Sequence, residues 1–251
     1  MTATINDMGT IPPMHHREAM ELAETEAARL VEVVDGLGAG DWSRPTDCTA
    51  WDVHALLGHL LGSMEAHARA REFVRQFIKA VRAAKRSGAP MIDEMTALQV
   101  RDHADMSPEA MRRRLHELAP LAIRGRRRVP AAIRVIPFTP GPPFEGSWKL
   151  GYLLGPIMTR DAWMHRVDLT RATGTDMVLT PAHDGRIVAD VAAEWARRHG
   201  QPVTLILEGP AGGSFAQGDG GGELRLDAVE FCRTVAGRVA GTGLLSQEVP
   251  F

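Results

Sequence analysis

The sequence predicts a mainly helical α+β protein, a helical bundle followed by a small α/β domain, and three observations lead to this fold class. Long segments within residues 1–175 repeat apolar residues every three or four positions, the spacing of a buried helix face. Residues 176–251 differ, with a β-branched run at 201–207 and a glycine-rich tract at 209–222. A chain of 251 residues can form two cores, so we expect two domains, 1–175 and 176–251.

Composition narrows the classes of partner. With 44% hydrophobic and 24% charged residues and a formal net charge of -2, the chain has no basic excess, and we expect no nucleic-acid partner. No segment approaches the roughly 20 apolar residues that cross a bilayer, and the N-terminus lacks a signal-peptide pattern, so we expect no membrane partner and a cytoplasmic location. Cys48 and Cys232 lie far apart and fit a reducing compartment. The basic tract 124–128 is interpreted as a helix end.

The first two helices of the bundle follow from apolar periodicity and capping residues. Residues 16–37 form an amphipathic helix that ends at a pair of glycines. After a turn-rich link, Thr49 is expected to cap a second helix. Asp52, at the third helical position, is expected to bond back to this cap. This helix is expected to cover 51–85, and whether it is interrupted on the way stays open.

Two further helices complete the expected bundle. Ser107 and Pro108, followed by a glutamate, are a strong start signal for a third helix that reaches about Arg126. The five prolines of residues 129–146 forbid a regular helix and predict a long ordered loop. A fourth helix then ends near Gly174. Four helices of this length pack most economically as an antiparallel bundle, whose core can hold a metal between facing helices.

The second domain is expected to alternate short elements. Its glycine-rich tract matches no phosphate-binding fingerprint, because no GxGxxG lies between a strand and a helix and no GK[ST] occurs. We interpret the tract as a hairpin-like, flexible connection. The expected elements are a helix over 180–198, a strand over 201–207, a strand over 224–226 and a helix over 227–239 capped by Asp227.

The main chemical signal is Asp161 and His165, four residues apart in the fourth helix. Side chains at this spacing lie on one helix face, one turn apart. They interrupt an apolar stripe that includes Leu154, Ile157, Met158 and Leu169. Buried polar side chains need partners. A metal ion is one candidate partner, and a nearby arginine is the other, with three to choose from: Arg160, Arg166 and Arg171.

Two blocks of the sequence resemble one family. Residues 42–60 (WSRPTDCTAWDVHALLGHL) and 160–174 (RDAWMHRVDLTRATG) are similar to the mycothiol-dependent maleylpyruvate isomerase family, and the C-terminal stretch 227–251 resembles the second domain of that family. The resemblance covers nearly the whole chain. It implies a DinB-like antiparallel four-helix bundle followed by a small α/β domain.

The resemblance also implies a metal site. In the family a divalent ion, usually zinc, is held by a histidine of the second-helix block and by a carboxylate and a histidine on the last bundle helix. Carried over to this chain, the ligands are His59, Asp161 and His165. The family more often has glutamate at the carboxylate position, so the shorter Asp161 requires the ion to lie nearer the helix or the helix to shift.

The choice of histidine on the second helix has an alternative. The main apolar stripe of that helix directs His67 inward more directly than His59. We favour His59 because it occupies the matching place, eight residues after Trp51, whereas His54 and His116 are interpreted as ordinary helix residues. The stripe consists of Val53, Leu57, Leu60 and Met64.

The function implied by the resemblance is that of a metal-dependent, mycothiol-using isomerase or S-transferase that acts on a small electrophilic substrate. An open position on zinc binds a thiol as thiolate and lowers its pKa. The alternative, from another class, is a non-catalytic metal-stabilised module that binds a small molecule or a partner. Arg238 is expected either to bind an anionic substrate group or to bond helix-end carbonyls. Asp168 is expected either to orient His165 or to form an ion pair.

Overall fold

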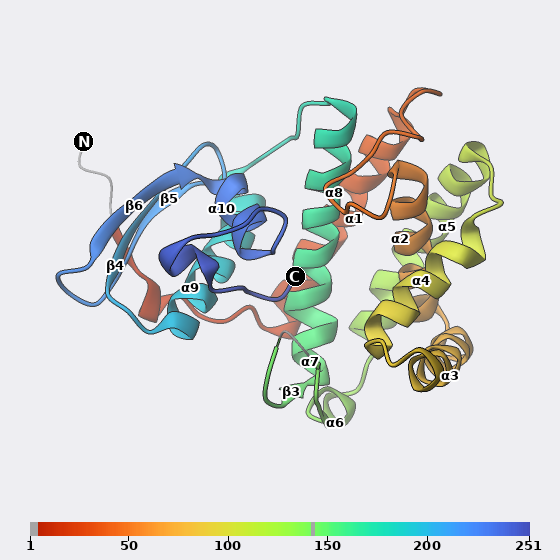
Figure 1. Ribbon diagram of the computed structural model, residues 1–251, viewed down its shortest axis with the longest axis horizontal. Helices are drawn as coiled ribbons and strands as arrows, with labels where there is room; N and C mark the ends of the chain where they lie inside the picture. The colour runs from red at the N-terminus through yellow and green to blue at the C-terminus, as the bar shows by residue number, and fades with distance from the viewer. Residues whose placement is uncertain (1–4, 142–143) are drawn as a thin grey trace. The chain divides into compact units, whose positions relative to one another are not determined.

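The computed structural model describes residues 5–141 and 144–251 (Figure 1). It divides into two compact units, one of residues 16–176 and one of residues 5–15 together with 177–251. The first unit is helical and the second contains a small sheet, so the prediction of a mainly helical α+β protein is confirmed. Our expected division, 1–175 and 176–251, assigned the N-terminal residues to the bundle, whereas the structure groups residues 5–15 with the second unit.

Four long helices form the bundle. Helix α1 packs against α5 and α8, and α2 packs against α5. Aliphatic and aromatic side chains of α1, α2 and α5 meet in one core, which includes Leu30, Leu57, Leu61, Leu115 and Leu118. The helices are α1 (His16–Asp35), α2 (Val53–Ala68), α5 (Pro108–Arg127) and α8 (Met158–Thr173).

Along the sequence, two more helices follow α2 and precede α5. The helix predicted over 51–85 breaks at Arg69, whose backbone is extended, into α2 and α3 (Ala70–Ser87). Helix α4 (Met91–His103) was not predicted from the sequence. Its buried positions include two polar residues, Gln99 and His103, and this mixture weakens the apolar periodicity that reveals a helix. Helix α4 packs against both α2 and α3.

The helix starts are set by side-chain caps. Asp52 caps α2, since its Oδ1 accepts a hydrogen bond from the Ala55 amide at 2.8 Å, so the predicted cap Thr49 is wrong. Ser107 caps α5 and Pro108 occupies the first turn, as the sequence predicts. Helix α8 ends where Gly174 adopts a left-handed backbone with φ 70.

The connection from α5 to α8 contains four short elements and one π-helical turn within its described residues. Residues 142–143 of the predicted loop lie outside the described residues. A two-stranded antiparallel ribbon pairs Phe138 with Trp148. The elements are α6 (Ala131–Arg134), β2 (Pro137–Phe138), β3 (Trp148–Lys149), α7 (Leu150–Tyr152) and the π-helical turn η2 (Leu153–Ile157), which runs directly into α8.

The second unit is built on a four-stranded sheet of order β1-β5-β4-β6. Strands β4 and β5 are antiparallel, whereas β6 runs parallel to β4 and β1 runs parallel to β5. The glycine-rich tract interpreted as a flexible connection contains β5, because Phe215 of that segment is buried opposite Leu205. The strands are β1 (Ile5–Asp7), β4 (Val203–Glu208), β5 (Gly213–Gln217) and β6 (Gly222–Asp227).

Two helices and three short helical turns complete this unit. Asp227 caps α10, as predicted, with its Oδ1 accepting from the Val229 and Glu230 amides. The helix stops at Val235, earlier than the predicted 239. The elements are η1 (Met8–Thr10), η3 (Pro181–Gly185), α9 (Arg186–His199), α10 (Ala228–Val235) and η4 (Gly243–Ser246).

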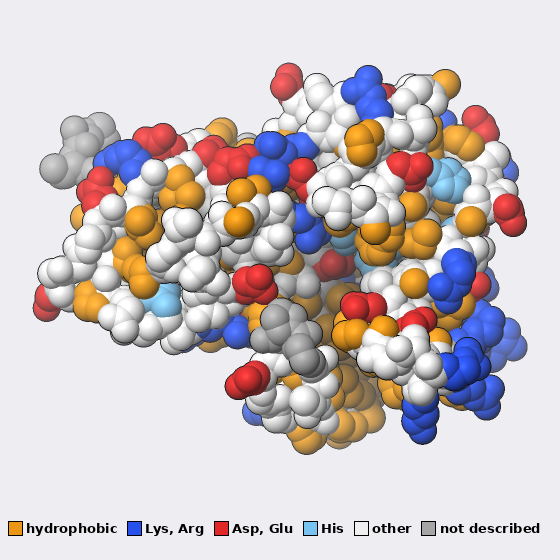
Figure 2. Space-filling view, viewed as in Figure 1, with side chains coloured by type: hydrophobic (Ala, Val, Ile, Leu, Met, Phe, Trp, Pro, Cys, Tyr) orange, Lys and Arg blue, Asp and Glu red, His pale blue; other side chains and the backbone are white. Residues whose placement is uncertain are grey.

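Helix α3 lies on the outside of the bundle. Basic side chains gather over this helix in Figure 2. Among its residues, Lys79, Arg82 and Lys85 are exposed. The rings of Phe73 and Phe77 stack on the same helix with centroids 6.0 Å apart. Among the described residues, no helix combines the length and the apolar character needed to cross a membrane.

Candidate metal centre

Three side chains from two helices converge within the bundle. His59 lies on α2, and Asp161 and His165 lie one turn apart on α8. One ligand atom from each residue lies within 4.8 Å of the other two. The rings of His59 and His165 are 5.2 Å apart between centroids. Ligand atoms around a tetrahedral zinc ion are about 3.4 Å apart, so small side-chain rotations would bring this set onto one ion.

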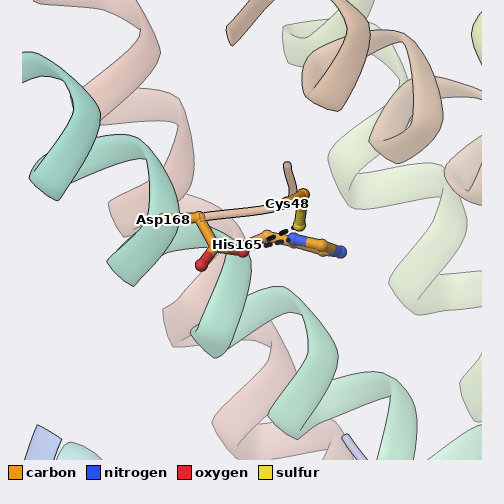
Figure 3. Close-up of side chains that lie close together, drawn as sticks. All are labelled: Cys48, His165 and Asp168. Atoms are coloured by element: carbon orange, nitrogen blue, oxygen red, sulfur yellow. Dashed lines mark hydrogen bonds and ion pairs between the residues drawn. The ribbon is translucent and has the colours of Figure 1, made fainter. Parts of the chain in front are cut away.

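His165 is held between two carboxylates. Its Nδ1 donates a hydrogen bond to Asp168 Oδ2 at 2.9 Å (Figure 3). Its Nε2 lies 3.4 Å from Asp161 Oδ1. Burial alone would lower the pKa of His165, but these carboxylates outweigh it and raise the pKa well above 6.5. Asp168 thus contacts the ring at Nδ1, while Nε2 faces Asp161.

His59 is oriented from its other side by an amide. Its Nδ1 lies 2.8 Å from Gln99 Oε1, a side chain of α4, and both residues are buried. Gln99 was not singled out from the sequence, because α4 itself was not predicted. The apposition depends on Gly62 of α2, where a Cβ atom would lie 2.6 Å from the Gln99 side chain. A small residue at this position is the only local signal for such close packing.

An indole covers both imidazoles. The Trp51 ring centroid lies 5.0 Å from that of His59 and 6.4 Å from that of His165. The side chains of His59 and His165 are 7% and 5% exposed respectively, whereas Asp161 is 22% exposed. The three donor atoms thus meet in a largely dry environment, in which electrostatic interactions are stronger than in water.

A second donor set shares His165. Cys48, His165 and Asp168 also have ligand atoms within 4.8 Å of one another, and Cys48 Sγ donates to Asp168 Oδ2 at 3.4 Å (Figure 3). Here the carboxylate already accepts two hydrogen bonds, one from the thiol and one from the imidazole. An ion in this set would have to displace both protons, so the set with His59 and Asp161 fits a cation better.

His67, the alternative ligand, is not among the side chains whose ligand atoms converge. Its Nε2 lies 3.3 Å from Met158 Sδ. Burial, with a further contribution from Arg126, lowers the pKa of His67 to about 3. His67, Arg126 and Asp161 line a mostly apolar cavity of about 40 Å³. The cavity has room for about three water molecules. Because Asp161 lines it, this residue borders both the cavity and the candidate metal centre.

Comparison with known proteins identifies the family to which this chain belongs. The family model of the mycothiol maleylpyruvate isomerase N-terminal domain matches residues 23–170. The chain belongs to this family. Two similar solved structures are a mycothiol-dependent maleylpyruvate isomerase and a histidine-to-alanine mutant of that enzyme. Both are 15% identical to this chain and cover 94% of it and 93% of their own chains, with TM-scores of 0.59 and 0.58. No curated protein matches significantly.

The family match confirms the resemblance inferred from the two sequence blocks, since both lie almost wholly within residues 23–170. At 15% identity the solved structures show a common fold. His54 and His116, interpreted from the sequence as ordinary helix residues, do not belong to the converging set. His54 Nε2 donates to the Met106 carbonyl at 2.8 Å, and His116 Nε2 lies 3.0 Å from Asp35. Arg238 belongs to the second unit, where its amide donates to the Arg233 carbonyl at 2.9 Å.

The converging residues fit a divalent ion by their chemistry. Two imidazole nitrogens and one carboxylate oxygen form a donor set that suits zinc and leaves coordination positions for other ligands. Each imidazole is bonded at Nδ1 to an oxygen atom, Gln99 Oε1 for His59 and Asp168 Oδ2 for His165. This arrangement is the usual one for metal-binding histidines, because it directs the opposite nitrogen toward the ion.

Proposed function

We propose that this chain is a divalent-metal-dependent enzyme that uses mycothiol as a thiol cosubstrate for isomerisation of a small electrophile or for S-transfer to it. One observation carries the proposal: ligand atoms of His59, Asp161 and His165 lie within 4.8 Å of one another. Zinc is the proposed ion because two histidines and a carboxylate are a donor set of catalytic zinc sites. Family membership supports mycothiol as the thiol.

The proposed chemistry divides between the ion and the protein. A divalent ion in this site would bind a thiol as thiolate and lower its pKa, which provides a nucleophile at neutral pH. Trp51 keeps water from the two imidazoles, while Gln99 and Asp168 hold the rings in place. Cys48 and Cys232 are free cysteines, and the proposed chemistry requires neither. A cytoplasmic location, which keeps mycothiol reduced, completes the proposal.

We also propose Arg238 as the residue that binds an anionic group of the substrate, since a guanidinium pairs with carboxylates through two parallel hydrogen bonds. The substitution Arg238→Met would test it. An increase in KM for an anionic electrophile with kcat unchanged supports this role, whereas unchanged kinetics contradict it.

One observation favours a second candidate function. His165 Nε2 lies 3.4 Å from Asp161 Oδ1, and these residues form an ion pair whenever His165 is protonated. The cluster can therefore satisfy its own charges, as a structural ion pair does. In that case the chain is a non-catalytic module that binds a small molecule or a partner.

Metal and thiol titrations distinguish the two functions. The purified protein is stripped with a chelator, reloaded with zinc and titrated calorimetrically with mycothiol, and maleylpyruvate is then supplied as the first electrophile. We expect one zinc per chain and thiol binding only to the zinc-loaded form, followed by isomerised product or a thiol conjugate. Zinc binding without thiol binding would support the non-catalytic module. A chain that binds neither would overturn the proposal.

A further inference from the structure

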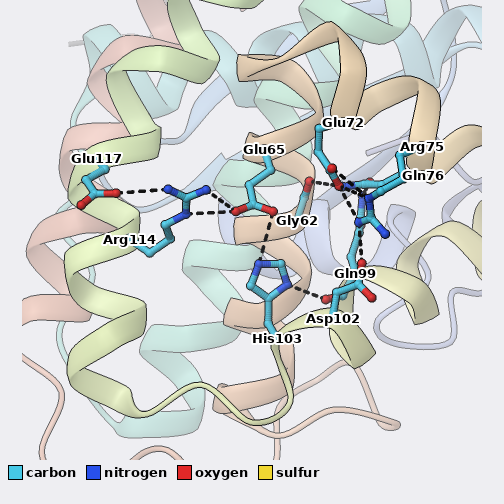
Figure 4. Close-up of polar contacts among 10 residues, drawn as sticks. All are labelled: Gly62, Glu65, Glu72, Arg75, Gln76, Gln99, Asp102, His103, Arg114 and Glu117. Atoms are coloured by element: carbon cyan, nitrogen blue, oxygen red, sulfur yellow. Dashed lines mark hydrogen bonds and ion pairs between the residues drawn. The ribbon is translucent and has the colours of Figure 1, made fainter.

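A buried row of amide side chains connects α2, α3 and α4 to His59. Gln76 of α3 donates from Nε2 to the Gly62 carbonyl at 2.9 Å and to Glu72 Oε1 at 2.9 Å. Gln99 of α4 donates from Nε2 to Gln76 Oε1 at 2.8 Å (Figure 4). Gln76 and Gln99 are 1% and 4% exposed, so neither amide can exchange these partners for bulk water.

The partners of Gln76 settle the direction of every hydrogen bond in the row. A backbone carbonyl and an ionised carboxylate can only accept, so the Gln76 nitrogen must face Gly62 and Glu72. Glu72 is ionised, because the hydrogen bonds from Arg75 lower its pKa. The Gln76 oxygen must then face the Gln99 nitrogen, and the Gln99 oxygen must face His59. His59 Nδ1 is therefore the donor of its 2.8 Å hydrogen bond to Gln99.

A neutral imidazole carries one proton, so a proton on Nδ1 leaves the lone pair on Nε2. We propose that this row, which we call the amide chain (the Gly62 carbonyl, Gln76 and Gln99), positions His59 by fixing its tautomer, so that Nε2 is the atom that it offers to the candidate metal centre. The inference rests on the proposed metal site for its purpose, but the tautomer itself is a property of the metal-free protein.

The packing around the amide chain is built to keep Gln99 in place. Gly62 leaves room for its side chain, since a Cβ at Gly62 would lie 2.6 Å from Gln99 Cβ and Cγ. The carbonyl of Gln99 accepts from His103 Nδ1 at 2.8 Å. At the end of the amide chain farthest from His59, Glu72 is held by Arg75, which also pairs with Asp102. A histidine whose orientation comes only from burial would need none of these contacts.

The first test reads the tautomer directly. The metal-free protein is labelled with ¹⁵N in its histidine rings, and long-range ¹H–¹⁵N spectra are recorded at about pH 8, where an ordinary imidazole is neutral. The signals of His59 are assigned by their loss in His59→Ala. We expect a protonated Nδ1 and an unprotonated Nε2. A proton on Nε2 in the wild-type protein would overturn the proposal without any substitution.

Variants then separate the amide chain from a simple local contact. Gln99→Leu removes the acceptor and should give a mixture of tautomers. Gln76→Leu does not remove the residue bonded to His59, but it frees the Gln99 amide to rotate and should give a mixture as well. Gln99→Glu no longer donates to Gln76, but it presents only acceptor atoms to His59 and should therefore keep the proton on Nδ1. Leu98→Ala, at a 7% exposed neighbour on α4, controls for loss of packing and should leave the tautomer unchanged.

Zinc affinity, measured by competition with a chelator, gives the second readout. Gln99→Leu should weaken binding by about 10- to 100-fold, the range for loss of a partner that orients a metal-binding histidine. Gln76→Leu should weaken it less, while Gln99→Glu and Leu98→Ala should stay near wild type. An unchanged tautomer in both Gln99→Leu and Gln76→Leu would overturn the amide chain. If the wild-type protein binds no zinc, the proposed function fails, and the tautomer still decides this inference.

Discussion

Consecutive residues of α8 bury charge in two different ways. Arg166 is completely buried and meets the equally buried Glu26 of α1, with Nε 2.6 Å from Oε1 and Nη2 3.0 Å from Oε2. His165, one residue earlier, lies between Asp161 and Asp168 and beside the His59 ring. In the first contact a guanidinium donates two hydrogen bonds to one carboxylate. The second gathers two carboxylates and two imidazoles.

The difference separates a structural ion pair from a site. The two parallel hydrogen bonds of Arg166 match both oxygens of Glu26, which is the geometry of a bidentate ion pair. Around His165, two carboxylates and a second imidazole converge, and their oxygen and nitrogen atoms are the kinds of ligand atom that a divalent ion binds. Equal burial on one helix therefore does not indicate equal roles. The donor atoms that converge on each residue do.

The largest expected effect is on the structural pair. Glu26→Gln removes one charge at nearly constant shape and breaks a fully buried ion pair with Arg166, which should reduce the free energy of unfolding by about 3–5 kcal/mol. Denaturant titration measures it. Glu24→Gln is the matched control, since Glu24 lies on the same helix and pairs with Arg127 at an exposed position, where the change should stay below about 1 kcal/mol. Equal losses in the two variants would refute the distinction.

His165→Ala should have a large effect on zinc binding and a smaller effect on stability. Removal of one of three ligands should weaken zinc binding by more than about 100-fold, because even loss of a ligand's hydrogen-bond partner costs 10- to 100-fold. The free energy of unfolding of the metal-free protein should change less than in Glu26→Gln. Chelator competition and denaturant titration on one preparation provide both values. The control is His54→Ala, which removes a histidine that donates to the Met106 carbonyl and should keep full zinc affinity.

His103 provides a further test of this comparison, because the carboxylate that it faces, Glu65, is already paired with Arg114. Glu65 accepts from Arg114 and lies 3.6 Å from His103 (Figure 4). The nearby imidazole of His103, helped by Arg114 and opposed by burial, lowers the pKa of Glu65 from 4.5 to about 2. Burial opposes protonation of His103, but the contact with Glu65 outweighs it and raises the pKa of His103 above 6.5.

These shifts set the pH dependence of stability. The lowered pKa of Glu65 adds stability that is complete above pH 4.5 and is lost as the pH falls through about 2. The raised pKa of His103 adds stability that is complete below pH 6.5 and is lost as the pH rises through its folded value. Glu65→Gln should therefore cost about 1–3 kcal/mol between pH 4.5 and 6.5, and less on either side. Denaturant titrations across pH measure this. A constant difference at every pH would contradict it.

The sequence predicted those elements whose signals are local. Ser107 and Asp227 cap helices as expected, because an N-cap depends only on the next three residues. The Asp161–His165 spacing predicted a shared helix face for the same reason. Asp52 replaced Thr49 as the cap of α2 because two suitable side chains lay three residues apart, and sequence alone does not choose between them.

The remaining features depend on contacts between distant segments. The N-terminal strand β1 pairs with β5, more than 200 residues later, and nothing in its own three residues announces that partner. Helix α4 buries Gln99 and His103 where a periodic pattern would require apolar residues. The orientation of His59 was unpredictable for this reason, since it comes from the α4 side chain Gln99.

The smallest expected effect is that of Asp161→Glu, which adds one methylene to the carboxylate ligand and leaves its charge unchanged. In a tightly packed core an added methylene costs about 1–3 kcal/mol. Asp161 is 22% exposed, however, and borders the cavity of about 40 Å³ that His67 also lines, so the longer side chain has space to shift into. We therefore expect zinc affinity to stay the same or to rise by up to about tenfold, or 1.4 kcal/mol. The melting temperature should change little. Chelator competition and thermal unfolding test both expectations. A fall in both quantities would mean that the bundle has packed around aspartate and that the His165 side of α8 resembles its Arg166 side, with every group already satisfied by the protein.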